Sequence, residues 1–351
     1  MRWLDPEGPG LSRSGGAGPS DHKAITLNHQ TVMVPILNHA SALSPYVAHV
    51  QRGGGSAKLL RAGELVAEIS FPKQPAFYRL STADGIPYWK IATLHASDVL
   101  ATTVLQTCTR YGHRETACQF CAIGQSLAAK STIPEKTPAQ LAEVASAAAR
   151  LDGVQHVVLT TGTPRTPDRG AAILADCARA IKNAANLPIQ TQCEPPDDFG
   201  WFERLREAGV DSLGLHLEAV SERVRHRIMP GKAEVPVTVY LEAFEHATRV
   251  FGRGQVSTYI LAGLGDTREE ILEMCERLAK LGVYPFVVPF VPIAGTALEH
   301  EPPPEPRFML DVLDGVAAIL ADYQIKSSEI KAGCGRCGAC STLKAREAAH
   351  A

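Results

Sequence analysis

The chain has 351 residues, with 35 Lys or Arg, 37 Asp or Glu, 12 His and a formal charge of −2. Hydrophobic residues make up 45 % and charged residues 21 %, which is typical of a globular chain that forms one large domain or two ordinary ones. The near-neutral charge gives no electrostatic reason to expect a nucleic-acid partner. We expect no membrane span, because no apolar run reaches roughly 18 residues. The first residues, MRWLDPEG, do not resemble a signal peptide, so we expect a cytoplasmic protein.

The N-terminal quarter of the sequence divides into two parts. Residues 1–24 are rich in Gly, Pro and Ser and offer little apolar surface to offset the entropy of ordering, so they predict a disordered tail. Residues 25–96 predict a small N-terminal subdomain that contains β-strands. Its expected strands include residues 65–69 and 88–92, with Pro and Gly between them.

From residue 97 to residue 300 the sequence alternates between strand-like and helix-like patterns. The expected strands are 99–107, 154–161, 187–193, 211–217, 255–262 and 284–291, and the expected helices are 138–151, 171–186, 200–208, 237–251 and 267–281. This order predicts an α/β fold with a parallel sheet, curled into a partial (β/α)6 TIM-like barrel. A doubly wound open sheet is the structural alternative. Residues 301–351 predict a last helix, 305–323, and a Cys-rich C-terminal tail.

Nine cysteines in a reducing compartment require an explanation other than disulfides, and an odd number fits a disulfide framework poorly. Six of them form two groups, which we call the first trio (Cys108, Cys118, Cys121) and the tail trio (Cys334, Cys337, Cys340). The other three are Cys177, Cys193 and Cys275. Isolated cysteines are usually small buried apolar residues, which we expect for Cys177 and Cys275, whereas Cys193 ends a strand near the expected active face.

The first trio directly follows the first barrel strand, at the edge where such barrels carry their active sites. Three thiolates can hold three irons of a [4Fe–4S] cube and leave the fourth iron open. An open iron can chelate an amine and a carboxylate, a pair that S-adenosylmethionine (SAM) offers. The alternative is zinc, because Cys118 and Cys121 together with Cys334 and Cys337 could form a tetrahedral Cys₄ site.

The segment Cys118-Gln119-Phe120-Cys121 resembles the cysteine motif of the radical SAM superfamily, and further segments resemble biotin and lipoyl synthases in the right order. They are 160–163 (TTGT), 216–218 (HLE), 260–266 (ILAGLGD) and 288–296 (VPFVPIAGT). The resemblance implies that SAM is bound by Phe120, Thr161, Gly162, Thr163, His216, Glu218, Gly263 and Val291. Among these, 161–163 would bind the amino group and His216 with Glu218 the ribose.

The sequence departs from that family pattern in three places. Nine residues separate Cys108 from Cys118, where the commonest spacing is three, although the cost of closing a longer loop grows only logarithmically. His216 replaces the usual Asn. The Arg that binds the SAM carboxylate in biotin synthase has no counterpart near residues 237–239. Arg225, Arg227 or Lys232 could replace it, and we assign the role to Arg227 because Arg binds carboxylates with two hydrogen bonds.

The whole chain is most similar to an uncharacterised biotin synthase-like branch encoded beside nitrilase genes, through stretches such as CQFCAIGQSL and TIPEKTP. This resemblance implies a role in nitrogen or nitrile metabolism. For the tail trio it implies an auxiliary [4Fe–4S] cluster, and the alternative is a structural zinc site that needs one more ligand, such as a His.

The sequence therefore predicts a radical SAM enzyme. Reductive cleavage of SAM would give a 5′-deoxyadenosyl radical that abstracts hydrogen from a small-molecule substrate, held by Gln192, Glu194 and Tyr259 at the barrel mouth. A reducing partner such as ferredoxin or flavodoxin would supply the electron. The second hypothesis is a non-catalytic iron–sulfur or zinc protein that carries electrons or acts as a scaffold.

Overall fold

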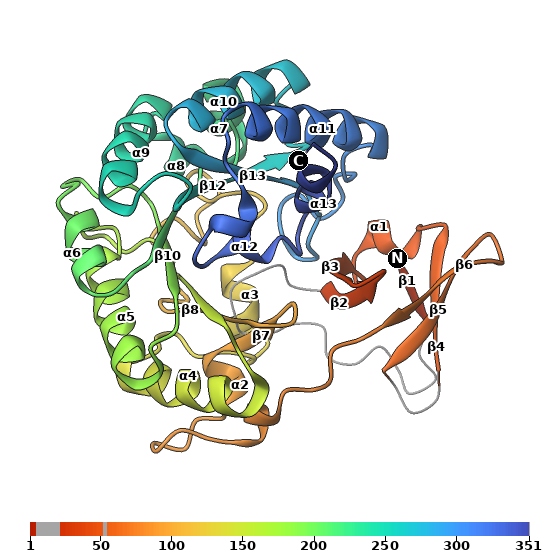
Figure 1. The fold of residues 1–351 in the computed structure, drawn as a ribbon, viewed down its shortest axis with the longest axis horizontal. Coiled ribbons are helices and arrows are strands. Elements are labelled where there is room, and N and C mark those ends of the chain that lie inside the picture. The colour runs from red at the N-terminus through yellow and green to blue at the C-terminus, as the bar shows by residue number, and fades with distance from the viewer. Residues whose placement is uncertain (5–21, 52–54, 351) are drawn as a thin grey trace.

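The structure is a computed structural model and describes residues 1–4, 22–51 and 55–350 (Figure 1). The strands are β1 (Arg2–Leu4), β2 (His22–Leu27), β3 (Gln30–Pro35), β4 (Tyr46–Val50), β5 (Ser56–Arg61), β6 (Glu64–Ser70), β7 (Thr93–His95), β8 (Val99–Thr103), β9 (His156–Thr160), β10 (Ile189–Cys193), β11 (Ser212–Leu215), β12 (Val256–Ala262) and β13 (Val283–Pro289). The α-helices are α1 (His39–Ala42), α2 (Tyr88–Ile91), α3 (Ile123–Ala128), α4 (Pro138–Asp152), α5 (Ala171–Ala185), α6 (Trp201–Glu207), α7 (Glu222–Ile228), α8 (Pro230–Ala233), α9 (Val237–Phe251), α10 (Arg268–Lys280), α11 (Pro306–Asp322), α12 (Cys334–Cys337) and α13 (Leu343–His350). Two short 3₁₀ helices are η1 (Ala76–Arg79) and η2 (Ser327–Glu329).

The larger sheet has seven strands in the order β13-β12-β11-β10-β9-β8-β7. Strands β8 to β13 are parallel neighbours in chain order, and β7 pairs antiparallel with β8. A doubly wound sheet would reverse its strand order at a switch point, and this sheet does not. The predicted partial (β/α)6 barrel is therefore confirmed, with α4, α5, α6, α9 and α10 around its outside (Figure 1).

The barrel elements form where the sequence pattern predicts them, because the pattern of apolar residues and the residues at the helix ends indicate the same elements. Every residue of β8 and β10 is buried, as expected for parallel strands that are covered on both faces. Helix α4 begins at a capping box of Thr137 and Gln140 and ends at Gly153, which has φ +67°, the left-handed conformation that glycine adopts without strain.

The smaller sheet lies beside the barrel and has the order β1-β4-β5-β6-β2-β3, with its own apolar core. Strands β1 and β2 place residues 2–4 and 22–24 in this sheet, so the expected disorder of residues 1–24 is wrong there, and residues 5–21 lie outside the described part. The expected strand at 88–92 is also wrong. Helix α2 forms there because its buried residues, Tyr88 and Ile91, are three apart.

The boundary between the subdomain and the barrel differs from the expected residue 96. Strand β7 belongs to the barrel sheet through its pairing with β8. Asp152, at the end of α4, accepts hydrogen bonds from the backbone N–H groups of Ala76 and Phe77 in η1. Residues 76–95 therefore pack with the barrel, and the small sheet ends at Ser70.

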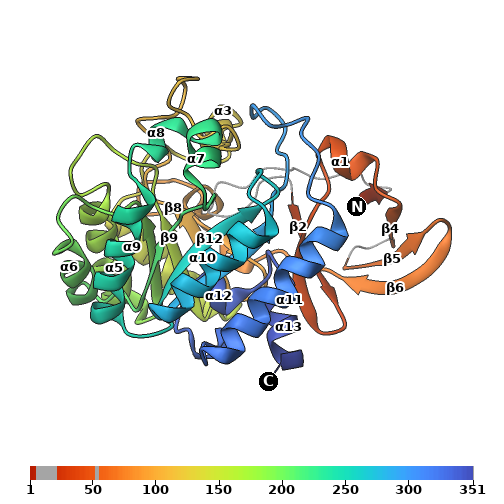
Figure 2. The ribbon, with the colours of Figure 1, turned by 90° about the horizontal axis from the view of Figure 1, so that it is seen from above.

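The tail after α11 enters the barrel at the amino-terminal ends of the strands, and α12 lies inside the ring of strands (Figures 1 and 2). The Gly333 N–H donates to Nδ1 of His156, the first residue of β9, at 3.1 Å. The Cys334 N–H donates to Oε1 of Gln190 in β10 at 3.2 Å. The tail also joins the small sheet, because the Met33 N–H donates to the Ala339 carbonyl at 2.8 Å. The tail thus closes the floor of the barrel.

Among the described helices, none combines the length and the apolar character needed to cross a membrane.

Candidate metal and cofactor site

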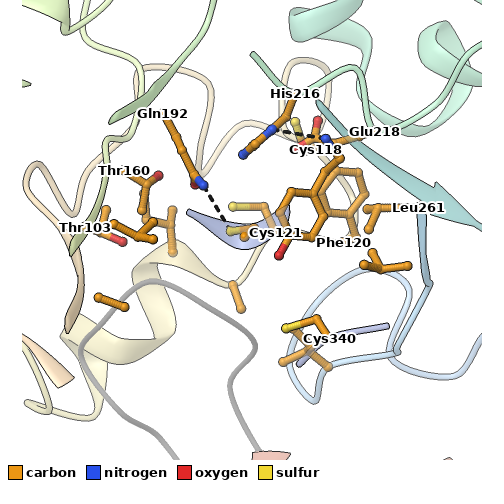
Figure 3. A pocket seen from close by; sticks show the side chains of 18 of the residues that line it. Thr103, Cys118, Phe120, Cys121, Thr160, Gln192, His216, Glu218, Leu261 and Cys340 are labelled. Carbon is orange, nitrogen blue, oxygen red and sulfur yellow. Dashed lines mark hydrogen bonds between the residues drawn. The ribbon is translucent and has the colours of Figure 1, made fainter. Parts of the chain in front are cut away.

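The two cysteine trios face one cavity of about 490 Å³ inside the barrel, a size within the roughly 300–1,000 Å³ range of small-molecule sites. The first trio reaches the cavity from the loop after β8, at the carboxyl ends of the strands, and the tail trio reaches it from the floor. Figure 3 shows side chains of both trios around this cavity. Cys177 and Cys275 are fully buried, as expected, and Cys193 is buried outside the cavity lining.

The long loop of the first trio is fixed to the barrel by backbone hydrogen bonds. The Thr109 N–H donates to the Thr163 carbonyl at 2.9 Å, and the Gln119 N–H donates to the Ile228 carbonyl at 2.9 Å. The loop also passes so close to Gly162 that a Cβ there would overlap the Thr107 carbonyl oxygen. Gly162 therefore permits the close approach of two backbones, and the nine residues between Cys108 and Cys118 do not form a loose excursion.

A buried charge network ties the same loop to the end of β10. Arg110, two residues after Cys108, pairs with Glu194. The Glu194 carboxylate also accepts a hydrogen bond from the Thr163 hydroxyl at 2.7 Å and lies 3.5 Å from the Arg169 guanidinium. Glu194 lines the cavity as predicted, and its Oε1 anchors the cysteine loop through Arg110, whereas its Oε2 is buried without a hydrogen-bond partner in the described residues.

The thiols of the first trio suit a cationic centre. Burial raises the pKa of Cys121 to about 11, and it raises the pKa of Cys118 well above the ordinary value. A metal ion provides the positive charge that converts such thiols to thiolates. Cys118 and Phe120 pack against a small apolar cluster that includes Met229 and Leu264, which limits the access of water to this end of the cavity.

His216 presents a polar atom to the cavity. Its Nδ1 accepts a hydrogen bond from the Tyr259 N–H at 3.2 Å (Figure 3), so the neutral ring carries its proton on Nε2. The Nε2 atom is buried and has no hydrogen-bond partner in the described part of the chain. Burial, with a smaller effect of the Lys232 charge, lowers the pKa of His216 to about 3. His216 thus offers one N–H donor to a ligand.

Glu218 and Lys232 form a pair next to His216 in the cavity wall. Lys232 Nζ donates to Glu218 Oε2 at 2.7 Å. Burial has the largest single effect and lowers the pKa of Lys232, but nearby acidic groups, with Glu218 foremost, together raise it more, and the net pKa is raised. Glu218 has φ +64°, an uncommon conformation for a residue other than glycine. Backbone hydrogen bonds to Tyr259 and Leu261 hold this strained turn.

Two residues expected to bind SAM lie outside the cavity. Arg227 is exposed, and its guanidinium donates to the Leu264 carbonyl at 2.6 Å, so its assignment is corrected. Lys232 is the basic residue from this segment that lines the cavity. Gly263 is also corrected, because a Cβ there would meet Pro304 and the wall is formed instead by Leu261. Gly263 directly follows β12 and is exposed.

The remaining expected site residues line the cavity, and their roles stay predictions. This set comprises both trios and Phe120, Thr161, Gly162, Thr163, His216, Glu218, Val291, Gln192, Glu194 and Tyr259. Part of the backbone of 161–163 is already bonded within the protein. The Gly162 N–H donates to the Leu105 carbonyl at 2.8 Å, and the Gly162 carbonyl accepts from the Thr161 hydroxyl at 2.8 Å. A carbonyl oxygen has a second lone pair for a ligand.

Gln192 and Tyr259, predicted to contact substrate, lie against the tail trio. Gln192 Nε2 donates to Cys334 Sγ at 3.1 Å (Figure 3). Burial raises the pKa of Cys334, and hydrogen bonds from Tyr259 and Gln192 partly offset this rise. Burial also raises the pKa of Cys337 to about 12. These thiols, too, need a cationic partner to become thiolates.

The donor atoms are not gathered for a single ion. Within residues 1–4, 22–51 and 55–350, no three His, Cys, Asp or Glu side chains converge as ligands of one metal ion. The four thiols of the zinc alternative therefore do not surround a common point. The ligands of an iron–sulfur cluster bind different irons and need not converge in this way.

The structure adds residues to the cavity that the sequence did not single out. His95, at the end of β7, lies 3.6 Å from Cys340 Sγ through its Nε2. Gln106 lines the cavity and accepts a hydrogen bond at 3.2 Å from Lys136, which is fully buried. Arg110 could have been noticed as a basic residue inside the cysteine loop. The others carry no sequence signal, because only the tertiary fold brings them to the cavity.

Comparisons with known proteins agree with this geometry. Residues 106–278 match the family model of the Radical SAM superfamily. The chain is 33 % identical over 140 residues to bacteriochlorophyllide c C-7(1)-hydroxylase of Chlorobaculum limnaeum, covering 39 % of this chain and 35 % of that protein. It is 30 % identical over 181 residues to lipoyl synthase of Marinobacter nauticus, covering 50 % of this chain and 47 % of that protein. The chain thus spans about half or less of the length of these two relatives.

The fold also agrees with a solved structure. Methylornithine synthase superposes with a TM-score of 0.50 at 17 % identity, covering 70 % of this chain and 67 % of that one. The order of the barrel strands, the first trio after β8 and the matched segment agree with one another. Residues 106–278, which run from the loop of the first trio to α10, are thus similar to the radical SAM superfamily.

Proposed function

We propose that this protein is a radical SAM enzyme whose first trio holds a [4Fe–4S] cluster and whose cavity binds SAM and a small-molecule substrate. The cluster, when bound, supplies one electron that splits SAM into methionine and a 5′-deoxyadenosyl radical, which takes a hydrogen atom from the substrate to give 5′-deoxyadenosine and a substrate radical. A reducing partner such as ferredoxin or flavodoxin would provide this electron.

The chain's own residues bind and orient SAM in this proposal. Nε2–H of His216 donates a hydrogen bond, because Nδ1 is already occupied by the Tyr259 N–H. Glu218 accepts from ribose hydroxyls, and Lys232 donates to the SAM carboxylate. Their present pairing at 2.7 Å keeps both charges compensated before SAM binds.

Exclusion of water is the second task of the protein, because solvent and stray hydrogen donors would quench a carbon radical. The tail closes the floor through the hydrogen bonds of Gly333 and Cys334 to β9 and β10. The small sheet contributes His22, Met33 and Pro35 to the cavity lining. The small sheet and the tail thus cover openings that a partial barrel leaves.

One observation supports this proposal most strongly. Two cysteine trios more than 200 residues apart in the sequence line a single cavity, at the two ends of the barrel. A substrate between them would contact a radical source on one side and a second redox or Lewis-acid centre on the other. We therefore propose that the tail trio also holds an iron–sulfur centre.

The substrate is part of the proposal only as a class. Glu194, Gln192 and Tyr259 give the cavity polar contacts, and Leu261, Phe286 and Val288 give it apolar ones, which suits a small molecule of mixed character. The resemblance to a branch beside nitrilase genes directs the search to nitrogen or nitrile metabolism. The two curated relatives act on different molecules, by their names, so they do not define this reaction.

The test is anaerobic reconstitution with iron and sulfide, followed by dithionite and SAM. Release of 5′-deoxyadenosine is expected, and it should stop when Cys108, Cys118 and Cys121 are replaced by Ala. The matched control replaces Cys334, Cys337 and Cys340 by Ala, which should remove one iron centre but leave some SAM cleavage. A colourless zinc protein that leaves SAM intact would refute the enzyme and support a scaffold or carrier protein instead.

A further inference from the structure

The tail trio has a fourth potential ligand on a different element. His95 ends β7, the edge strand of the barrel sheet, and both His95 and the tail trio line the cavity. Its Nε2 lies 3.6 Å from Cys340 Sγ. His95 and Cys340 are 245 residues apart in sequence, so this contact depends on the tail entering the barrel floor.

The separation of these two atoms matches that of two ligands on one tetrahedral metal ion. Bonds of about 2.0–2.1 Å to nitrogen and about 2.3 Å to sulfur, at a tetrahedral angle, place the two donor atoms roughly 3.5 Å apart. The same distance also suits a hydrogen bond to sulfur, so the experiment below must separate the two. Donors on neighbouring irons of a cube would lie farther apart, because each iron takes only one protein ligand there.

The other two cysteines form a second pair. Cys334 and Cys337 are the first and last residues of α12, and an i, i+3 spacing puts side chains on one face of a helical turn. The four donors thus form two pairs, Cys334 with Cys337 on α12, and Cys340 from the turn after α12 with His95 from β7. A [2Fe–2S] centre needs two protein ligands on each of two irons, and mixed cysteine and histidine ligation of such centres is chemically established.

We propose that the tail centre is a [2Fe–2S] cluster in which Cys334 and Cys337 bind one iron while Cys340 and His95 Nε2 bind the other. This inference rests on the second centre of the proposed function and changes its type from the four-iron cube expected by resemblance. Ligation by two pairs on two irons also explains why no three ligands converge on a single point in the described residues. With one imidazole ligand, the cluster has a higher reduction potential than it would have with four cysteine ligands.

A second histidine nearby provides the matched control. The Nδ1 of His156 accepts a hydrogen bond from the Gly333 N–H at 3.1 Å, and its Nε2 is buried without a hydrogen-bond partner in the described chain. A neutral ring that accepts at Nδ1 carries its proton on Nε2, so this atom is a donor and not a metal ligand. His156 therefore lies beside the centre and is expected not to bind iron.

The test uses the full chain with Cys108, Cys118 and Cys121 changed to Ala, so that only the tail centre remains, with further variants His95→Cys and His156→Gln. Iron, sulfide and pulsed-EPR coupling to ¹⁴N are measured after anaerobic reconstitution and reduction. We expect two irons and two sulfides per chain with a strong nitrogen coupling. His95→Cys should retain the iron, lose the coupling and lower the midpoint potential, whereas His156→Gln should retain the coupling.

Each other result has a definite meaning. Bound iron and sulfide without nitrogen coupling, coupling that survives His95→Cys, or four irons per chain would overturn the His95 inference alone. A chain without iron would overturn the second centre of the proposed function. Should the triple Ala variant fail to fold, the unmodified chain labelled with ¹⁵N-histidine is measured instead, and the absence of a nitrogen coupling there has the same meaning. SAM cleavage by the unmodified chain reports separately on the first trio.

Discussion

The Glu194→Gln substitution tests whether the buried charge network holds the cysteine loop. Glu194 and its partner Arg110 have only 8 % and 11 % of their side chains exposed. The substitution keeps an oxygen that can accept from the Thr163 hydroxyl but removes the charge that compensates Arg110. Removing one member of a buried pair leaves the other charge uncompensated, which costs about 3–5 kcal/mol.

This cost predicts a measurable loss of thermal stability. A chain of this length has an unfolding entropy of about 0.7 kcal/mol per kelvin, so Glu194→Gln should lower the Tm by about 4–7 °C. The double variant Arg110→Met/Glu194→Gln should be less destabilised than the sum of the single variants, with a coupling of roughly 0.5–3 kcal/mol. The exposed pair Arg179 and Asp176, with 56 % and 65 % of the side chains exposed, is the control, and its coupling should be below about 0.5 kcal/mol.

The assay is scanning calorimetry of the four proteins in each cycle, together with iron content after anaerobic reconstitution. Iron at the first trio should fall with Glu194→Gln, because the loop that carries Cys108 and Cys118 loses its anchor. A Glu194→Gln protein with an unchanged Tm, or a coupling as small as that of the exposed pair, would refute the anchoring role.

Three further predictions follow from single residues. Burial lowers the pKa of Lys136 to about 7. Between pH 7 and about 10.5 the unfolded chain therefore binds a proton that the folded chain lacks. In this range the free energy of unfolding rises by about 1.4 kcal/mol for each pH unit. Lys136→Met should remove this slope in urea unfolding at pH 7.5 and pH 9, and an unchanged slope would contradict it. Gly162→Ala should lower the iron content of the first trio, since the new Cβ overlaps the Thr107 carbonyl; full iron loading would disprove this close approach. Lys232→Met should weaken SAM binding by roughly 10- to 100-fold in equilibrium dialysis, because a hydrogen bond to a charged group is worth about 1.5–3 kcal/mol; equal affinity would show that Lys232 does not contact SAM.

The barrel could be predicted from the sequence because each of its strands is a buried apolar run between helices with clear end signals. The strand expected at 154–161, for example, is observed as His156–Thr160. The strand expected at 88–92 is wrong because a short mixed run fits both the strand period of 2 and the helical period of 3.6. The burial of Tyr88 and Ile91 against the rest of the fold selects the helical period.

The site was predictable where residues follow barrel strands directly. The position after a strand places Glu218 in the cavity, as it does Thr161. The positions of Arg227 and Gly263 relative to the cavity could not be predicted. The direction of a helix side chain, or of a turn, depends on tertiary packing. The entry of the tail through the barrel floor, which brings Cys340 to His95, has no local sequence signal at all.

The most direct test of the central claim is an anaerobic crystal structure with anomalous diffraction measured at the iron edge. Two separate iron peaks are expected in the one cavity, the first bound by Cys108, Cys118 and Cys121, and the second by the tail trio. A single peak surrounded by Cys118, Cys121 and thiols of the tail would contradict two centres and restore the zinc-type arrangement.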